Sequence, residues 1–463
     1  MAQFDLIVLG AGPAGYVGAI RAAQLGAKVA VIEEREVGGT CLNRGCIPSK
    51  ALIHSAHLLD EAASARRFGI KFGEPEVDLD GVRKHAERTV KGLVAGVEGL
   101  FKAHKIVSVK GRAKVAGPTE VLVTSPSGQE KTVSSKYILV ATGSEPFVLP
   151  IPGHESDAVF TSDDAVALPG PYPRLAIIGA GAIGCEFAYI YSRFGSKVTI
   201  VEMLERIVPT EDPEATDILA KSLKKAGVGI ELGAKCVRID ETSDAKRLVF
   251  ERGGEEHVVE ADGILMAAGR RALTKGIGLE ESGVTMDRGR ITVDAQLRTS
   301  VESIFGAGDC LRGIGLAHQA SHEAVAAVET MFGDGGHMNY AAVPGAIYTY
   351  PQIASVGVRA HEAAAQGLEV SVGTFPFSAI GKASAIGERE GFVKLVAEAA
   401  SGKLIGASAV GPEVTELIAE ITLAVNLGLT ASDVANTIHT HPTLSEVTGE
   451  AALAVMGRAI HSA

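Results

Sequence analysis

The chain carries the same glycine pattern twice, and this duplication constrains its fold more than any other feature. Each copy is a Gly-x-Gly-x-x-Gly turn that follows a short apolar run and opens a stretch of helical character. The next apolar run of each copy ends on a glutamate, Glu33 or Glu202. Turn and glutamate both recur after 169 residues. The six glycines are Gly10, Gly12, Gly15, Gly179, Gly181 and Gly184.

This order of elements is the fingerprint of a Rossmann-like dinucleotide-binding unit. The first glycine makes the turn, the second lets a pyrophosphate approach the backbone, and the third lets the helix pack on the strand. The glutamate accepts hydrogen bonds from the adenosine ribose. Glycine turns that serve packing alone are the weaker alternative, because both copies keep the whole order of elements. Two units imply two dinucleotides, which we interpret as FAD in the first unit and a nicotinamide nucleotide in the second.

The residues around Glu202 indicate which nicotinamide nucleotide the second unit binds. A carboxylate at this point repels the 2′-phosphate of NADP. No arginine occupies the next three positions, Met203, Leu204 and Glu205, although Arg206 follows them. The sequence therefore favours NAD.

Three further glycine turns follow apolar runs and belong to these two units. Each unit closes with an apolar run and a glycine turn, at Gly143 and Gly269, and we expect both turns to lie at a cofactor. A further strand over residues 304–305 runs into a Gly-Ala-Gly-Asp turn. We interpret it as a return to the first unit that completes the flavin site, where we expect Asp309 and Ala317.

The pattern changes after Gly345. Apolar residues alternate along Phe392–Val396 and Leu404–Val410, which predicts an antiparallel hairpin, and Val414–Leu427 shows helical spacing. We therefore expect an α/β protein with two Rossmann-like domains and a C-terminal α+β domain that serves dimerisation, because 463 residues exceed one ordinary core. The expected parts are an FAD-binding domain (1–148), an NAD-binding domain (149–275), a central return to the FAD domain (276–345) and the dimerisation domain (346–463).

Two of the five cysteines, Cys41 and Cys46, are separated by four residues just after the first fingerprint. Three interpretations compete: half of a zinc site, inert buried thiols, and a redox pair beside a cofactor. A zinc site needs further ligands, and the other three cysteines are scattered. Pro48 suits the first turn of a helix, which places Cys46 near a helix N-terminus, and Lys50 adds positive charge. Both features favour a thiolate, so we favour the redox pair and expect no metal.

A candidate base for thiol chemistry lies near the C-terminus. His441 is followed five residues later by Glu446, which could orient its imidazole and stabilise the imidazolium. Two alternatives stay open on these residues alone: Glu446 could form a capping box with Thr443, and the His-x-His segment could bind a metal. His318 and His322, four apart on a predicted helix, are interpreted as structural or close to a cofactor.

Charge and hydropathy exclude several classes of protein. The net charge of −11 disfavours nucleic acid as a partner, because phosphate binding needs a basic face. No apolar run is long enough to predict a membrane span. The chain reaches Asp5 almost at once, so we expect no signal peptide and a cytoplasmic location. A mature organellar enzyme would share these features.

Together the motifs resemble the pyridine nucleotide-disulfide oxidoreductases, and among them the dihydrolipoamide dehydrogenases. The resemblance runs over essentially the whole chain and rests most firmly on Gly-Gly-Thr-Cys41-Leu-Asn-Arg-Gly-Cys46-Ile-Pro-Ser-Lys50 and His441-Pro-Thr-Leu-Ser-Glu446. It implies oxidation of dihydrolipoyl groups with reduction of NAD, through a redox disulfide and FAD. One mild departure is Ala324, where the family usually has glycine.

The resemblance also implies a role for each site residue. Cys41 exchanges thiols with the substrate, Cys46 faces the flavin, and Lys50 lies near its reactive edge. His441 takes a proton from the attacking thiol, oriented by Glu446, and this pair reaches the active site of the other subunit of a homodimer. The implied partner is a lipoylated protein: the acyltransferase of a 2-oxoacid dehydrogenase complex or the glycine cleavage H protein.

The rival enzymes of this family differ at positions that can be read in the chain. Glutathione-type reductases usually carry basic residues near the position of Glu202 and use NADP. Mercuric reductases have an extra C-terminal cysteine pair, whereas no cysteine follows Cys310 here. Soluble transhydrogenases lack the pair formed by Cys41 and Cys46. A flavoprotein with a mainly structural role in a multienzyme complex is the alternative from another class.

Overall fold

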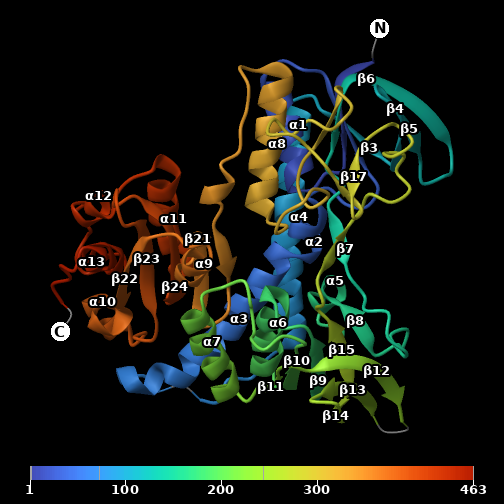
Figure 1. Cartoon of the computed structure of the whole chain (residues 1–463). Coiled ribbons are helices and arrows are strands. Elements are labelled where there is room, and N and C mark those ends of the chain that lie inside the picture. Colours follow the sequence, from blue (N-terminus) through green and yellow to red (C-terminus); the bar gives the residue numbers. More distant parts are fainter. Residues whose placement is uncertain (1–2, 72, 171, 243–244, 462–463) are drawn as a thin grey trace.

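The computed structural model describes residues 3–71, 73–170, 172–242 and 245–461. Two domains built on parallel sheets lie together, and a third domain, formed by the C-terminal residues, lies to one side of them (Figure 1). Within the described residues no helix is long and apolar enough to cross a membrane.

The first domain is centred on a sheet in the order β3-β2-β1-β6-β5-β4, with β19 on the other side of β6. Strands β3, β2, β1 and β19 run parallel to the end of β6, whereas β5 and β4 extend its beginning as an antiparallel sheet. Helices α1 and α8 lie side by side on this sheet (Figure 1). The elements are β1 (Phe4–Leu9), α1 (Pro13–Gln24), β2 (Val29–Glu33), β3 (Val107–Lys110), β4 (Arg112–Gly117), β5 (Glu120–Thr124), β6 (Glu130–Val140), β19 (Ile304–Gly306) and α8 (Ala317–Phe332).

The second domain repeats this plan. Its parallel sheet has the order β11-β10-β9-β15-β8, and a separate antiparallel sheet β12-β13-β14 takes the place that β4, β5 and the start of β6 hold in the first domain. The sequence repeat is therefore a repeat of whole supersecondary units. The elements are β8 (Val159–Thr161), β9 (Arg174–Ile178), α6 (Ala182–Arg193), β10 (Lys197–Val201), α7 (Pro213–Lys225), β11 (Gly229–Glu231), β12 (Lys235–Glu241), β13 (Lys246–Arg252), β14 (Glu255–Ala261) and β15 (Gly263–Met266).

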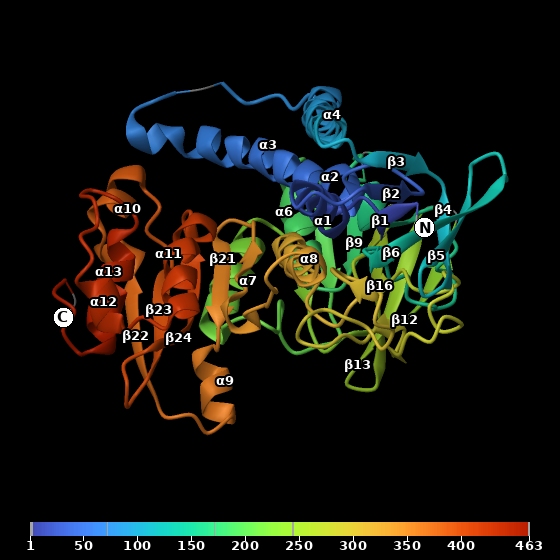
Figure 2. The same cartoon turned by 90° about the horizontal axis from the view of Figure 1, so that it is seen from above.

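Three helices occupy the longer spacing of the first unit. They are α2 (Gly39–Arg44), α3 (Cys46–Ser64) and α4 (Leu79–Ala103), and they follow β2. Helices α3 and α4 cover one side of the molecule, and α3 extends towards the C-terminal domain (Figure 2). Helix α3 ends at Ser64, and α4 begins at Leu79.

The third domain is an antiparallel sheet in the order β20-β21-β24-β23-β22, with helices packed against it. The predicted hairpin is confirmed as β23 and β24, which run two residues and one residue beyond the predicted ends. The predicted helix is confirmed as α11, with the bounds that the sequence indicated. The elements are β20 (Gly345–Ile347), β21 (Gln352–Gly357), α9 (Ala360–Ala365), β22 (Val370–Pro376), α10 (Gly381–Ile386), β23 (Phe392–Glu398), β24 (Leu404–Gly411), α11 (Val414–Leu427), α12 (Ala431–Ala435) and α13 (Glu446–Val455).

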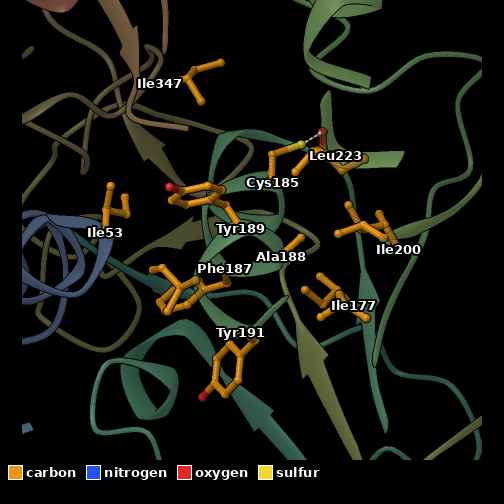
Figure 3. Packing of buried hydrophobic residues seen from close by; sticks show 14 of the residues in the cluster. Ile53, Ile177, Cys185, Phe187, Ala188, Tyr189, Tyr191, Ile200, Leu223 and Ile347 are labelled. Atoms are coloured by element: carbon orange, nitrogen blue, oxygen red, sulfur yellow. Dashed lines mark hydrogen bonds between the residues drawn. The ribbon is translucent and has the colours of Figure 1, made fainter. Parts of the chain in front are cut away.

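Helix α6 is the point where the three domains share a core. Its residues Cys185–Tyr191 are all buried. Ile177 and Ile200 pack on it from the sheet of the second domain, and Ile53 and Ile347 belong to the same cluster, from α3 and β20 (Figure 3). Because cores are close-packed, this cluster fixes the position of α6 relative to all three domains.

Candidate active site

The two glycine turns have the same geometry in both domains. Gly10 and Gly179 have φ angles of 98° and 103°, which favour glycine. A Cβ atom on them would lie 2.4 Å from the carbonyl oxygen of Ala141 and 2.5 Å from that of Ala267. These two turns therefore pass so close to the neighbouring strand that only glycine fits.

The second and third glycines differ in what surrounds them. A Cβ atom on Gly15 or Gly184 would lie 1.9 or 2.0 Å from the first glycine's carbonyl oxygen. By contrast, the nearest atom to a Cβ on Gly12 is 3.8 Å away, and Gly181 faces open space within 4 Å. The turn is closed at its third glycine and open at its second, as a pyrophosphate cradle requires. The residues present therefore fit two dinucleotides.

Both glutamates at the strand ends are held by the turn they face. Glu33 accepts hydrogen bonds from the backbone nitrogens of Ala11 (2.7 Å) and Arg35 (2.6 Å). Glu202 accepts them from Ala180 (2.7 Å) and Leu204 (2.8 Å). A carboxylate has about four lone-pair sites, so each keeps acceptor capacity for a ribose.

The cysteine pair lies at the junction of two helices. Cys41 is on α2, and Cys46 is the first residue of α3. Asn43 anchors α2 by donating hydrogen bonds to the carbonyl oxygens of Val37 (3.0 Å) and Gly39 (2.9 Å). Both cysteines are free thiols and only partly buried, whereas the other three are fully buried.

The two thiols shift each other's pKa in opposite directions, which makes them unequal. The hydrogen bond from Cys41, helped by the positive charge of Lys50, lowers the pKa of Cys46 to about 7 although burial opposes the shift. The same hydrogen bond and burial raise the pKa of Cys41. Cys46, at the start of α3, is therefore the thiol of the pair that ionises more readily.

Lys50 is held by residues from two other domains. Its Nζ atom lies 2.8 and 3.0 Å from the carboxylate oxygens of Glu186 and 4.4 Å from the ring centroid of Tyr348. The backbone nitrogen of Tyr348 donates to the same carboxylate at 3.0 Å. Burial works against the charge, but Glu186 raises the pKa of Lys50, so the ammonium persists beside Cys46.

Sequence reasoning missed Glu186 and Tyr348. Glu186 is 6% exposed on a helix whose other residues over 185–191 are apolar, and it stands two residues after Gly184. A lone acid on an apolar helix face was the signal that could have found it. Tyr348 had no such signal, because 162 residues separate it from Glu186.

The predicted His441–Glu446 contact is present. His441 Nδ1 lies 2.8 Å from Glu446 Oε1, and Glu446 Oε2 accepts a hydrogen bond from the Thr443 backbone nitrogen at 2.9 Å. Glu446 therefore both orients the imidazole and ties down the start of α13. Burial works against it, but these hydrogen bonds lower the pKa of Glu446. The imidazole of His441 is 77% exposed, and its Nε2 atom points away from the carboxylate.

Within one chain the structure does not bring this pair to the cysteines. The cysteines lie on α2 and at the start of α3, which packs against α6 of the second domain. Helix α13 lies on the outer part of the third domain (Figures 1 and 2). In the described part of the chain, no group of three or more His, Cys, Asp or Glu side chains could hold a metal.

The remaining predicted residues gather at the edge of the first sheet. Asp309 Oδ2 accepts a hydrogen bond from Ser144 (2.5 Å), which follows Gly143 and also receives one from Arg270 (2.8 Å). These contacts join the closing turns of both units, because β7 (Ser144–Pro146) pairs with β16 (Arg270–Ala272). Ala317 begins α8.

Helix α8 carries His318 and His322, and His318 contacts a backbone carbonyl group. His318 Nε2 lies 2.7 Å from the carbonyl oxygen of Pro344, which connects α8 to the chain entering the third domain. His322 stands one turn further along the same helix. The interpretation of His318 as structural is consistent with this contact.

Two family models match the chain. The model described as "Pyridine nucleotide-disulphide oxidoreductase" covers residues 4–324, and that of its dimerisation domain covers residues 343–452. A mitochondrial dihydrolipoyl dehydrogenase of Dictyostelium discoideum is 41% identical over 99% of this chain and 96% of its own length. The dihydrolipoyl dehydrogenase of Thermus scotoductus is 42% identical over 100% of this chain and 99% of its own.

Solved structures show the same architecture. LpdA from Mycobacterium tuberculosis superposes with a TM-score of 0.90 at 28% identity, covering 96% of this chain and 98% of that one. The HOCl-induced flavoprotein disulfide reductase RclA from Escherichia coli, in its Cu(II) complex, superposes with a TM-score of 0.87 at 26% identity, covering 98% and 99%.

Proposed function

The chain belongs to the pyridine nucleotide-disulphide oxidoreductases, and we propose that it oxidises protein-bound dihydrolipoyl groups to lipoyl groups while reducing NAD to NADH. The observation that carries this proposal is the cysteine pair. Cys46 stands at a helix start beside Lys50, and its pKa is lowered to about 7, with the neighbouring Cys41 thiol as the largest cause. Relatives of full length that are named dihydrolipoyl dehydrogenases support the choice of substrate.

We assign FAD to the first glycine turn and NAD to the second. Glu33, Asp309, Gly143 and Ala317 would complete the FAD site, and Lys50 would lie near its reactive part. The flavin, when bound, supplies the carrier of the electron pair between dithiol and nicotinamide nucleotide. On this assignment residues 1–148 and 276–345 form the FAD domain, 149–275 the NAD domain and 346–463 the dimerisation domain.

We assign NAD to the second site because of Glu202 and the glycine turns near it. Its carboxylate is fixed by two backbone nitrogens, so it cannot swing away from a 2′-phosphate without losing both hydrogen bonds. Repulsion by a held carboxylate favours NAD over NADP. Gly269 would border the same nucleotide.

The thiol chemistry follows from the unequal cysteines. His441 of one subunit takes a proton from a dihydrolipoyl thiol, whose thiolate attacks Cys41 in the Cys41–Cys46 disulfide. The disulfide breaks, and Cys46 leaves as a thiolate that Lys50 stabilises. The second dihydrolipoyl thiol then loses its proton, and its sulfur displaces Cys41, which takes up the proton held by His441. The products are a lipoyl disulfide, one released proton, and a reduced pair with Cys41 as thiol and Cys46 as thiolate.

The proposed reaction also implies partner proteins for this chain. A chain that acts on protein-bound dihydrolipoyl groups needs a lipoylated acyltransferase of a 2-oxoacid dehydrogenase complex or the glycine cleavage H protein. The matched dimerisation domain supports a homodimer. The cytoplasmic location stays a prediction.

Two parallel assays of the holoenzyme test the function. We expect rapid NADH formation from dihydrolipoamide and NAD, and no consumption of NADPH with glutathione disulfide. The Cys46→Ser variant is expected to lose the first activity. The opposite pattern in the two assays would refute the substrate, and full activity of Cys46→Ser would refute the role of the cysteine pair.

A further inference from the structure

A second histidine–glutamate pair lies two residues before the first one. His439 Nε2 is 3.0 and 3.2 Å from the two carboxylate oxygens of Glu420, on α11. The side chain of His439 is 11% exposed, whereas that of His441 is 77% exposed. Residues 436–445 form no helix or strand, and the largely buried ring of His439 is one of the anchors of this segment, which presents His441 to solvent.

Helix α13 has a glycine, Gly449, at the point where it contacts the ring of His439. A Cβ atom on Gly449 would lie 3.1 Å from His439 Nδ1 and 3.3 Å from its Cε1. Glycine in a helix interior is unfavourable, so its presence here needs a reason, and the imidazole that packs against it supplies one. Gly449 is three residues after Glu446, which places both on the same face of α13. The ring of His439 therefore lies one turn below the carboxylate that orients His441.

We propose that His439 is a positioning residue: it connects α11 to α13 and thereby fixes where His441 stands when it enters the substrate site of the other subunit. This inference rests on the proposed function. The carboxylate that contacts the ring is Glu420 from α11, and Glu446 stands three residues before Gly449 on α13. His439 touches neither thiol nor cofactor, so it acts through His441.

The test compares three variants of the holoenzyme. His439→Leu fills similar space but cannot bind Glu420, and we expect kcat with dihydrolipoamide to fall about 10- to 100-fold with little change in KM, because a misplaced group costs rate. His439→Gln places its amide nitrogen near the position of Nε2, and we expect it to restore most of the rate. Gly449→Ala favours the helix but pushes on the ring, and we expect it to lower kcat without lowering the thermal midpoint.

The matched control is a third histidine–glutamate pair, between Glu450 of α13 and His461, which follows that helix. His461 Nδ1 lies 2.6 Å from Glu450, and its side chain is 69% exposed. We expect His461→Leu to turn over at the wild-type rate. All variants are also assayed for NADH-driven reduction of ferricyanide, which needs no His441, and for dimer content.

The outcomes separate the two claims. Wild-type kcat in His439→Leu, or an equal loss of dihydrolipoamide and ferricyanide activities, would overturn the positioning role. Absence of dihydrolipoamide oxidation in the wild type would instead overturn the proposed function. A selective loss that glutamine restores supports the inference.

Discussion

At the scale of residues, the cysteine pair owes its asymmetry to one hydrogen bond and one charge. Cys46 begins α3, and Lys50 lies one turn further along the same helix. Glu186 and Tyr348 hold that lysine in place. A thiolate is the attacking and leaving form in thiol exchange, so this arrangement decides which sulfur leaves easily.

The reduced enzyme is expected to show a thiol that titrates near neutrality. The pKa of Cys46 lies at about 7, below that of an ordinary thiol, so its thiolate is present above that pH and is lost as the pH falls through it. Lys50→Met removes a stabilising charge and should move the midpoint of the iodoacetamide rate profile upwards by about one pH unit. Cys46→Ser should remove this component altogether. An unchanged midpoint in Lys50→Met would contradict the role given to the lysine.

At the scale of elements, the sequence predicted what local contacts determine. The glycine turns, the strands and helices around them and the hairpin β23–β24 depend on residues close in the chain, and so does the bond between His441 and Glu446. The contact between Lys50 and Glu186 depends instead on residues that are 136 positions apart in the chain. Hydrophobic periodicity contains no information on such a contact.

The two kinds of glycine in the second turn are expected to fail in different ways. A methyl group on Gly184 would overlap the carbonyl of Gly179, so Gly184→Ala should lower stability by about 1–3 kcal/mol and weaken NAD binding as well. A methyl group on Gly181 meets no atom within 4 Å, so Gly181→Ala should keep the wild-type thermal midpoint. It should still raise the KM for NAD at least about tenfold, since it occupies the space of the pyrophosphate. Equal KM values in Gly181→Ala and wild type would argue against the cradle.

At the scale of the whole molecule, a buried ion pair joins the second domain to the third. Lys394 on β23 lies 3.0 Å from Asp212, which also caps α7 through the Glu214 nitrogen, and their side chains are 6% and 2% exposed. Lys394→Met leaves the carboxylate buried without its partner and should cost about 3–5 kcal/mol. Asp212→Asn keeps a capping group, so the double variant should recover part of the loss. Thermal unfolding of the two single variants and the double variant gives the coupling; strictly additive losses would mean that the pair does not interact.

The separation of the cysteines from His441 within one chain makes a prediction about the dimer. In a two-fold dimer each active site would take its cysteines from one subunit and its base from the other. Cys46→Ser and His441→Gln homodimers should then both be nearly inactive, for different reasons. After the two variants are unfolded, mixed in equal amounts and refolded with FAD, half of the dimers should be hybrids with one intact site of two, so the mixture should recover about a quarter of the wild-type rate with dihydrolipoamide. Refolding of each variant alone is the control. A mixture no more active than its parents would place both groups in the same subunit's site and refute the shared active site.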